Sequence, residues 1–468
     1  MSVGKKMTGL GMAVYARSPL WAQNLLISAY GLRLLRLRYG RTGRETLASL
    51  LKSQWMDAAE LQSNQLTALS EVVGRAAVDV PFYRRRGLEG IDFDSLDQLR
   101  EVPPLTKSEV QRAGRDMIAD SYRRARLTEV HTGGTTGKPL VIYCDGETLQ
   151  RNYAFFSRFK GWAGVPDGDR VATFAGRTFI PRGGNEPFWR FNRAANTLLF
   201  SSYHIGAKTL PSYVKALADF QPMMIDSYPS SIEAIARYIL EHNITSIRPT
   251  AIITSSETLF PVVRDVVEQA FQCQVFDHYG GAEMAALIAQ CERGTYHIAP
   301  EFGVVEILKD GQPVARGETG EIVATGFINP VMPLIRYATG DNGVLGAGSC
   351  PCGRAGETLE RIEGRMDDMI ITPEGNLVGR LDPIFKAVSS LRETRIIQDA
   401  ADHVRVEIVA GDAFSTKMER GLQAELRARL GPAMRIDIVR VPSIERTGRG
   451  KLRTTINLVY PRSPTGAV

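Results

Sequence analysis

Short β-rich runs alternate with helical runs between about residue 125 and residue 360. RVATFAG, AIITSSETL and QVFDHYG are rich in β-branched or aromatic residues, and helical stretches such as SSIEAIARYIL separate them. Strands that alternate with helices in this way form a mostly parallel sheet covered by helices. The sequence therefore predicts a large α/β core. It continues as a β-meander in GVVEILKDGQPVARGETGEIVATGF, with turns at Asp-Gly and Glu-Thr-Gly.

The pattern restarts after RIEGRMDDMI as a smaller α/β unit. HVRVEIVA and MRIDIVRV indicate strands, and STKMERGLQAELRARL indicates an amphipathic helix between them. The predicted fold class is α/β, with a large multi-sheet N-terminal domain and a small mobile α/β C-terminal domain. We place the large domain at residues 1–364, with a helical N-terminal segment at 1–85, the small domain at 365–460 and a loose tail at 461–468.

Residues 45–78 carry apolar side chains at helical spacing, and DVPFYRRRG is expected to end that helical region. Upstream, SPLWAQNLLISAYGLRLLRLRYG is apolar, but arginines interrupt any span long enough to cross a bilayer, and no signal-peptide cleavage site follows. We interpret it as a helix packed on its own domain, with an interfacial helix on acidic lipid as the alternative. Without an export signal, the chain is predicted to be cytoplasmic with reduced cysteines.

Composition excludes some classes of partner. The 468 residues are 44% hydrophobic and 23% charged, as in an ordinary globular protein, and the formal net charge of +6 is modest for this length. No basic arm or arginine-rich tract occurs beyond the first fifty residues, so nucleic acid is not predicted as a partner.

A glycine- and threonine-rich loop, HTGGTTGKP, lies between two short β-rich runs. A Walker loop would need a glycine in place of Thr132 and a hydroxyl residue in place of Pro139, and it would lead into a helix. Even so, glycines admit a ligand to backbone N–H groups, and hydroxyls and a lysine suit phosphate oxygens. We interpret the loop as a polyphosphate clamp, with a solvated hairpin turn as the alternative. Its residues are Thr132, Gly133, Gly134, Thr135, Thr136, Gly137 and Lys138.

Four further stretches follow the loop in order. They are DHYGGAEM at 277–284, PLIRYATGD at 333–341, EGRMDD at 363–368 and ERTGRGKLR at 445–453. Together the five resemble the adenylate-forming superfamily of acyl-CoA synthetases and adenylation domains, and within it the phenylacetate–CoA ligase family. The likeness covers about residues 70–455, and five motifs in order are more specific than one. AQNLLISAYGLRLLRLRYG adds a weaker likeness to relatives found with capsule and exopolysaccharide biosynthesis proteins.

The resemblance implies a ligase that uses ATP and Mg²⁺ to activate a small carboxylic acid as an acyl-adenylate and then forms a thioester with coenzyme A. Tyr279 would stack on adenine beside Gly280, and Glu283 would hold the Mg²⁺ that bridges the phosphates. Asp341 would accept both ribose hydroxyls with its two carboxylate oxygens, and Arg365 would reinforce that contact. The structural alternative for Asp341 is an ordinary turn aspartate, for Arg365 a solvated arginine, and for Glu283 a carboxylate at a helix N-terminus.

Two further roles fall in the small domain. Asp367 would be the hinge about which this domain rotates to admit the thiol. Lys451 would be the catalytic lysine, because a positioned cation stabilises the negative charge that develops when a carboxylate attacks the α-phosphorus. Ala282 departs from the family, which usually has threonine or serine before the glutamate, and Gly133 stands where serine is common.

Two other functions fit the same residues. In an amide-forming ligase the adenylate would pass its acyl group directly to an amine, for example on a polysaccharide or a specialised metabolite. A non-catalytic nucleotide-binding protein would also keep the loop, although binding alone would not require Lys451 together with Glu283 and Asp341. The sequence names neither the acid nor the acceptor.

Cysteines and a histidine occur in CERGTYHIAPEFG and SCPCGR. These N/S ligands suit a closed structural zinc site that would fix two loops without taking part in the chemistry. The Cys-x-Cys spacing is tighter than usual, so free core cysteines are the alternative. The candidate ligands are Cys291, His297, Cys350 and Cys352. Cys144 and Cys273 are interpreted as core residues.

The acyl pocket is expected between NYAFFSRFKGWAG, NEPFWRF, IDSYPSS and ITSSETL, although aromatic residues in such places usually belong to a core. The predicted lining residues are Tyr153, Phe156, Trp189 and Tyr228, with Glu257 and Arg190 facing any polar group of the substrate.

Overall fold

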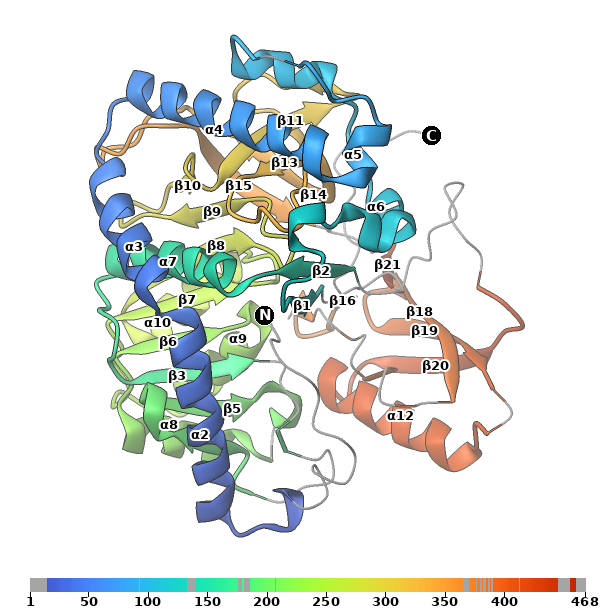
Figure 1. Ribbon diagram of the computed structural model, residues 1–468. Coiled ribbons are helices and arrows are strands. Elements are labelled where there is room, and N and C mark those ends of the chain that lie inside the picture. Colours follow the sequence, from blue (N-terminus) through green and yellow to red (C-terminus); the bar gives the residue numbers. More distant parts are fainter. Residues whose placement is uncertain are drawn as a thin grey trace. The chain divides into compact units, whose positions relative to one another are not determined.

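The protein forms two compact units, one ending at Gly364 and the other comprising the described residues from Ile370 onward. Figure 1 shows the computed structural model, coloured along the chain. It describes residues 15–91, 93–132, 140–175, 179–180, 186–206, 208–364, 370–375, 377–378, 381, 384–385, 388, 390–411, 413–444 and 455–459.

The larger unit is built on one sheet with the strand order β12-β11-β13-β14-β15-β10-β9-β8-β7-β6-β3-β5-β4. Five neighbouring strands are parallel, and an antiparallel edge strand, β4 (Trp189–Asn192), follows them. The parallel strands are β5 (Thr197–Ser201), β3 (Val171–Ala175), β6 (Met224–Ser227), β7 (Ala251–Ser255) and β8 (Gln274–Gly280). The predicted strand–helix alternation and the α/β class are thereby confirmed.

The sequence marks where the helices that follow the parallel strands begin and end. α9 (Pro229–Glu241) and α10 (Pro261–Phe271) both begin with a proline, which needs no hydrogen-bond acceptor at that position. α10 ends where Gln272 adopts a left-handed φ of 52°. The other helices of this region are α7 (Gly146–Trp162) and α8 (Leu210–Phe220).

The rest of the large sheet is antiparallel. It contains β9 (Leu287–Gln290), β10 (Tyr296–Ile298), β11 (Gly303–Lys309), β12 (Gln312–Pro313), β13 (Thr319–Gly326), β14 (Tyr337–Leu345) and β15 (Thr358–Gly364). The predicted Asp-Gly turn is present, with positive φ at Asp310 and Gly311. The predicted Glu-Thr-Gly turn is wrong: the turn uses Gly317, at φ 83°, and Gly320 already pairs within β13.

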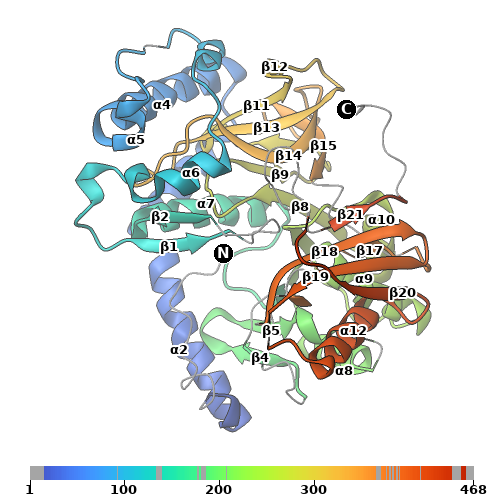
Figure 2. The same ribbon diagram turned by 90° about the vertical axis from the view of Figure 1, so that its right-hand side faces the viewer.

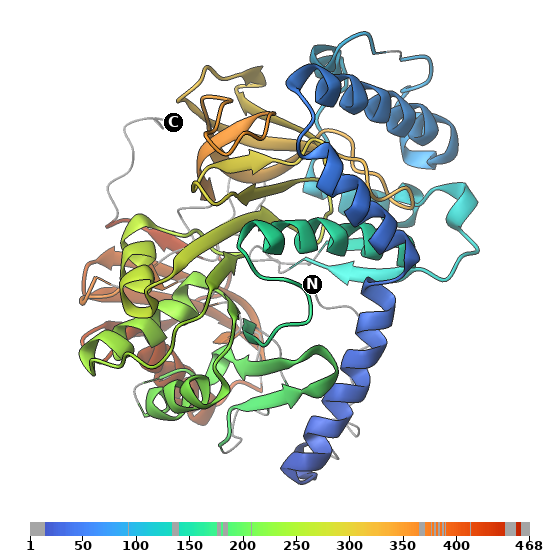
Figure 3. The same ribbon diagram turned by 90° about the vertical axis from the view of Figure 1, so that its left-hand side faces the viewer.

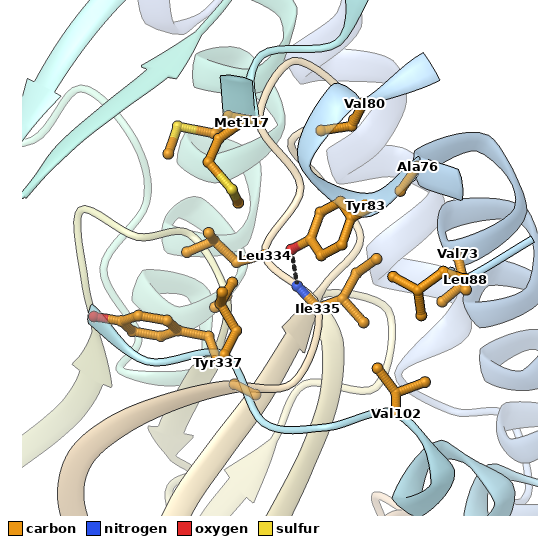
Figure 4. Packing of buried hydrophobic residues seen from close by; sticks show 14 of the residues in the cluster. Val73, Ala76, Val80, Tyr83, Leu88, Val102, Met117, Leu334, Ile335 and Tyr337 are labelled. Carbon is orange, nitrogen blue, oxygen red and sulfur yellow. Dashed lines mark hydrogen bonds between the residues drawn. The ribbon is translucent and has the colours of Figure 1, made fainter. Parts of the chain in front are cut away.

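The N-terminal part is helical, with α2 (Leu20–Arg38), α3 (Arg41–Ser53), α4 (Ala58–Asp79) and α5 (Pro81–Arg85). The helical region ends within DVPFYRRRG, as expected, but Pro81 of this stretch opens one more short helix, α5, that the sequence analysis did not predict. Tyr83 of α5 is fully buried, donates to the carbonyl of Pro333 (3.0 Å) and accepts from the N–H of Ile335 (3.0 Å; Figure 4). It therefore anchors these helices to the segment before β14. No helix in the described part of the chain has both the length and the apolar character needed to cross a membrane.

Two short strands, β1 (Thr128–His131) and β2 (Val141–Cys144), form a separate antiparallel pair with Thr128 opposite Cys144. The prediction that strands flank the glycine- and threonine-rich loop on both sides is confirmed. Short segments between α5 and β1 are η1 (Leu96–Glu101), α6 (Lys107–Ala113), η2 (Gly114–Met117) and η3 (Asp120–Tyr122).

The smaller unit has a four-stranded sheet of order β20-β19-β18-β21 and the helix α12 (Thr416–Leu430), labelled in Figure 2. Leu422 and Leu426 of α12 pack with Val404 and Val406 of the sheet in one core. The predicted strands and helix of this region are confirmed. The strands are β18 (Leu391–Ala400), β19 (His403–Ala410), β20 (Arg435–Arg440) and β21 (Thr455–Asn457), beside a small pair of β16 (Ile370–Ile371) and β17 (Leu377–Val378).

Candidate functional site

Tyr279 and Asp341 meet in the larger unit, although 62 residues separate them in sequence. Tyr279 lies near the carboxyl end of β8, and its Oη donates to Oδ2 of Asp341 in β14 at 2.9 Å. Burial, and then the Asp341 carboxylate, raise the pKa of Tyr279 well above its ordinary value. The phenol therefore stays protonated at neutral pH and remains a hydrogen-bond donor to Asp341.

The turn that presents Asp341 is fixed by its own hydrogen bonds. Gly340 adopts a φ of 77°, which glycine tolerates without strain, and its N–H donates to Glu321 at 3.2 Å. Thr339 Oγ1 donates to the carbonyl of Ile322 (2.8 Å) and accepts from the N–H of Asp341 (3.1 Å). The ATGD stretch thus holds its carboxylate in a defined position.

Glu283 lies in the turn between β8 and β9, and not at a helix N-terminus. Its side chain lies back over Gly281, where a Cβ would overlap the carboxylate. The backbone of this turn packs closely against Gly326, where a Cβ would stand 2.5 Å from the carbonyl oxygen of Met284. The opposite residue in the β11–β13 pairing, Gly303, similarly leaves room for Ala285. Three glycines thus set the position of Glu283.

Tyr228 and Glu257 lie beyond the carboxyl ends of β6 and β7, the two strands next to β8 in the parallel part of the sheet. Glu257 Oε2 accepts from the N–H of Ser230 in the first turn of α9 at 3.0 Å, where the helix dipole favours a carboxylate. Thr258 Oγ1 donates to the carbonyl of Glu363 at 3.2 Å, which joins the β7 loop to the end of β15. Predicted residues from several strand ends therefore share one edge of the sheet, where open α/β sheets bind ligands.

Three other predicted acyl-pocket residues, Tyr153, Trp189 and Arg190, contact side chains of the larger unit. Tyr153 lies under the Arg38 guanidinium (4.4 Å to the ring centroid), and Trp189 packs on Phe200 with centroids 5.6 Å apart. Arg190 is buried and donates to Gln23 at 2.6 Å. Trp189 pairs with Phe200 near the carboxyl end of β5, and therefore lies on the same edge of the sheet as Tyr228 and Glu257.

His278 is a buried imidazole beside the predicted site. It packs between Phe156 and Phe159, with ring centroids 5.4 and 5.2 Å away, and Phe156 is thus committed to this contact. Burial lowers the pKa of His278 to about 4, so the ring is neutral at physiological pH.

Sequence reasoning did not single out Asp277, a buried residue of β8 that hydrogen-bonds to side chains of β7 and β10. Its carboxylate accepts from Thr254 Oγ1 at 2.6 Å and from Tyr296 Oη at 2.8 Å, joining β7, β8 and β10. Burial raises the pKa of this carboxyl group. A charged residue inside an otherwise apolar strand was the signal available in QVFDHYG.

The four predicted zinc ligands converge, with their sulfur and nitrogen atoms all within 4.8 Å of one another. Cys291 Sγ lies 3.6 Å from Cys350 Sγ, and Cys352 Sγ lies 3.3 Å from Nε2 of His297. Metal–ligand bonds of about 2.3 Å to sulfur and about 2.0 Å to nitrogen give tetrahedral edges of roughly 3.8 and 3.5 Å. The observed separations are therefore close to those of a tetrahedral zinc centre.

Backbone geometry and charge also fit a metal. Gly294 and Gly353 have positive φ and turn the chain tightly after each cysteine stretch. The N–H of Arg293 donates to Cys291 Sγ at 3.3 Å, as backbone groups do to bound thiolates. Burial, followed by the charge of Arg354, lowers the pKa of His297 to about 4. This keeps the imidazole neutral, which is the form that binds metals. Of the other cysteines, Cys144 is buried as predicted, whereas Cys273 is only half-buried between α10 and β8.

Comparisons with known proteins match most of the chain. Residues 370–458 match the family model of the CapK C-terminal domain. The chain is 29% identical to Protein CapK of Staphylococcus aureus, over 95% of this chain and 98% of that protein. It is 28% identical to the phenylacetate-coenzyme A ligase of Escherichia coli strain K12, over 67% and 72% of the two chains. The chain is thus similar to CapK over nearly its whole length and to a phenylacetate–CoA ligase over about two thirds of it.

A solved structure has a similar fold. The crystal structure of 2-hydroxyisobutyryl-CoA ligase, in complex with 2-HIB-AMP and CoA in the thioesterification state, aligns with a TM-score of 0.59. The alignment covers 86% of this chain and 91% of that chain at 20% identity.

Several residues assigned from the superfamily motifs lie outside the described residues. They are Gly133, Gly134, Thr135, Thr136, Gly137, Lys138, Arg365, Asp367 and Lys451. Thr132 is described at the start of the loop: its Oγ1 accepts from the N–H of Leu140 at 2.9 Å, and its own N–H donates to the carbonyl of Leu140 at 3.0 Å. Thr132 thus closes the β1–β2 pair at the point where the loop begins.

Proposed function

We propose that the protein is an AMP-forming acid–thiol ligase. A carboxylate oxygen of the substrate attacks the α-phosphorus of ATP, the bond to pyrophosphate breaks, and an acyl-adenylate forms. The thiol of coenzyme A then attacks the acyl carbonyl, and AMP leaves. The observation that carries this proposal is the Tyr279–Asp341 pair beside the Glu283 turn at the carboxyl edge of the sheet. The named relatives support it, because they include CoA ligases and one is solved with an acyl-AMP and CoA.

Each residue of the site has a part in this reaction. Asp341 accepts the ribose hydroxyls with its carboxylate oxygens, and the Tyr279 ring covers the adenine. Ionised Glu283 supplies the oxygen ligand that Mg²⁺ prefers, and the bound metal would neutralise phosphate charge. Tyr228 and Glu257 border the carboxylic acid.

Residues outside the described ranges complete the proposal. The loop from Thr132 to Lys138 holds the β- and γ-phosphates, and Arg365 supports the ribose contact. Lys451 stabilises the charge that develops during adenylation. Rotation about Asp367 then exchanges Lys451 for the coenzyme A thiol.

We further propose a structural zinc at Cys291, His297, Cys350 and Cys352. The metal would hold the turn after β9 against the loop between β14 and β15. Arg354 braces this loop, because it pairs with Glu292 at 2.9 Å and stacks over Trp162 at 4.5 Å. β9 follows the turn that carries Glu283, and β14 carries Asp341. The zinc would therefore stabilise the nucleotide site without touching substrate.

Variants at Lys451 test the catalytic assignment. Lys451→Ala should abolish acid-dependent AMP formation and leave ATP binding within about threefold, because the lysine acts on the transition state. Lys417→Ala, which removes an exposed lysine from α12 of the same unit, is the matched control and should keep full activity. Full activity of Lys451→Ala would refute the assignment.

The acceptor is tested with the active acid once it is known. If AMP release needs coenzyme A, the acceptor is the thiol. If an amine alone supports release, the alternative of direct amide formation holds. ATP binding without any acid-dependent turnover would favour a nucleotide-binding role.

A further inference from the structure

Helix α2 contacts its own unit through polar side chains and a glycine in its first part, and through Leu34 and Leu37 near its end. It lies along the edge strand β4 and η4 (Arg193–Ala195), as Figure 3 shows for α2 (blue) beside the green strands. Gly31 sits directly on Asn192, with no room for a Cβ. Three side chains accept hydrogen bonds from the edge: Gln23 from the Arg190 side chain (2.6 Å), Asn24 from the N–H of Phe191 (3.0 Å) and Ser28 from the N–H of Arg193 (2.9 Å).

The outward side of α2 is apolar. Trp21, Leu25 and Leu26 are 70%, 62% and 51% exposed, and Tyr30 and Leu32 are also exposed. At about 100° per residue, Leu25, Leu26, Tyr30 and Leu32 fall on the half of the helix opposite Gly31, and Trp21 lies close to the border of that half. This arrangement inverts that of a surface helix in a globular protein, whose apolar stripe faces the core.

The charges around this apolar side are all positive. Residues 1–44 contain eight lysines and arginines and no aspartate or glutamate. Arg33 and Arg36 are exposed on the outward half of α2, in its last two turns. The face therefore combines aliphatic side chains, an indole and cations, which is the chemistry that recognises the headgroup region of an anionic bilayer.

We propose that α2 docks the protein on an anionic membrane surface. The helix lies flat in the interface, with Trp21, Leu25 and Leu26 below the headgroups and Arg33 and Arg36 against lipid phosphates. A second copy of the chain fits this face less well, because a symmetric contact would bring the arginines of two copies together, and residues 1–44 supply no acidic residue to pair with them. The polar contacts with β4 hold the helix in place and leave its apolar side for the lipid.

Vesicle co-sedimentation of the full chain tests this proposal. The wild type should bind vesicles of equimolar phosphatidylcholine and phosphatidylglycerol, bind phosphatidylcholine alone more weakly, and dissociate as salt rises. Leu25→Ser/Leu26→Ser should lower the partition coefficient at least about tenfold, because two partly inserted side chains are lost. Arg33→Gln/Arg36→Gln should lower it by about thirtyfold at low salt.

Val78→Ser/Val262→Ser is the matched control, since it removes two apolar side chains that are also more than half exposed, on α4 and α10. It should bind as the wild type does. Vesicle binding that is absent in the wild type, or reduced equally in the control, would overturn the proposal. So would self-association of the wild type that the Leu25→Ser/Leu26→Ser pair abolishes, because the occupant of this face would then be a second copy.

Discussion

Replacing Gly326 by alanine should displace the turn that carries Glu283. Gly326 lies in β13 opposite Gly303, and a Cβ there would stand 2.5 Å from the carbonyl oxygen of Met284 and 2.9 Å from the Cα of Ala285. Both neighbours are backbone atoms, which no rotamer change can move away. The turn from residue 281 to residue 286 must therefore shift as a whole.

The size of the shift follows from ordinary contact distances. Carbon atoms pack best at about 3.5–4.0 Å, so the Cα of Ala285 would move by roughly 0.6–1.1 Å. Overpacking of this kind costs about 1–3 kcal/mol of stability. A displacement of about 1 Å at a catalytic group costs about a hundredfold in rate. We therefore expect Gly326→Ala to lose about a hundredfold in kcat for adenylate formation and to remain folded.

The assay is ATP–pyrophosphate exchange with the active acid, alongside urea denaturation. Gly346→Ala is the control, because its Cβ would meet Thr358 at 2.6 and 3.0 Å, just past the end of β14. It should lose similar stability and keep its exchange activity. Wild-type exchange in Gly326→Ala, at the expected loss of stability, would refute the placement of Glu283 in the active site.

Three further predictions follow from the site. Asp341→Asn should raise the KM for ATP by about tenfold or more, because it removes charged hydrogen bonds, and an unchanged KM in steady-state assays would exclude the ribose contact. The wild type should hold one zinc per chain by elemental mass spectrometry, and Cys352→Ser should lose it; a metal-free wild type would exclude the zinc site. His278 has a pKa of about 4 when folded and about 6.5 when unfolded, so its neutral form contributes stability above pH 6.5 that falls, by at most about 3 kcal/mol, as the pH drops to 4. His278→Phe should remove that part of the pH dependence in urea titrations, and an unaltered pH dependence would show that the buried imidazole is not its source.

Local sequence patterns were sufficient for much of the fold. Runs such as QVFDHYG became strands because their β-branched and aromatic residues are bounded by turn residues, and the Pro-initiated helices follow them as expected. Where the prediction was incomplete, contacts with a distant part of the chain account for the difference. DVPFYRRRG forms α5 because Tyr83 finds backbone partners at Pro333 and Ile335, some 250 residues away in sequence.

The candidate site was predictable where residue type itself limits the chemistry. Two cysteine-containing stretches far apart in sequence proved to bring three thiols and an imidazole together. For an aromatic side chain, residue type does not restrict its role in this way. Tyr153 packs on Arg38 of α2, and Trp189 packs on Phe200. The sequence did not indicate these contacts, because the surfaces that they use exist only in the folded chain. The orientation of α2 was hidden for the same reason: the N–H groups of Phe191 and Arg193 select its polar side.

Carboxylate-dependent ATP–pyrophosphate exchange by the wild-type protein tests the central claim most directly. Purified protein with Mg²⁺, ATP and labelled pyrophosphate would be assayed against a panel of aryl, fatty and amino acids. The proposed adenylation predicts label in ATP with at least one acid and none without acid. Absence of exchange across the panel, with ATP binding intact, would contradict it.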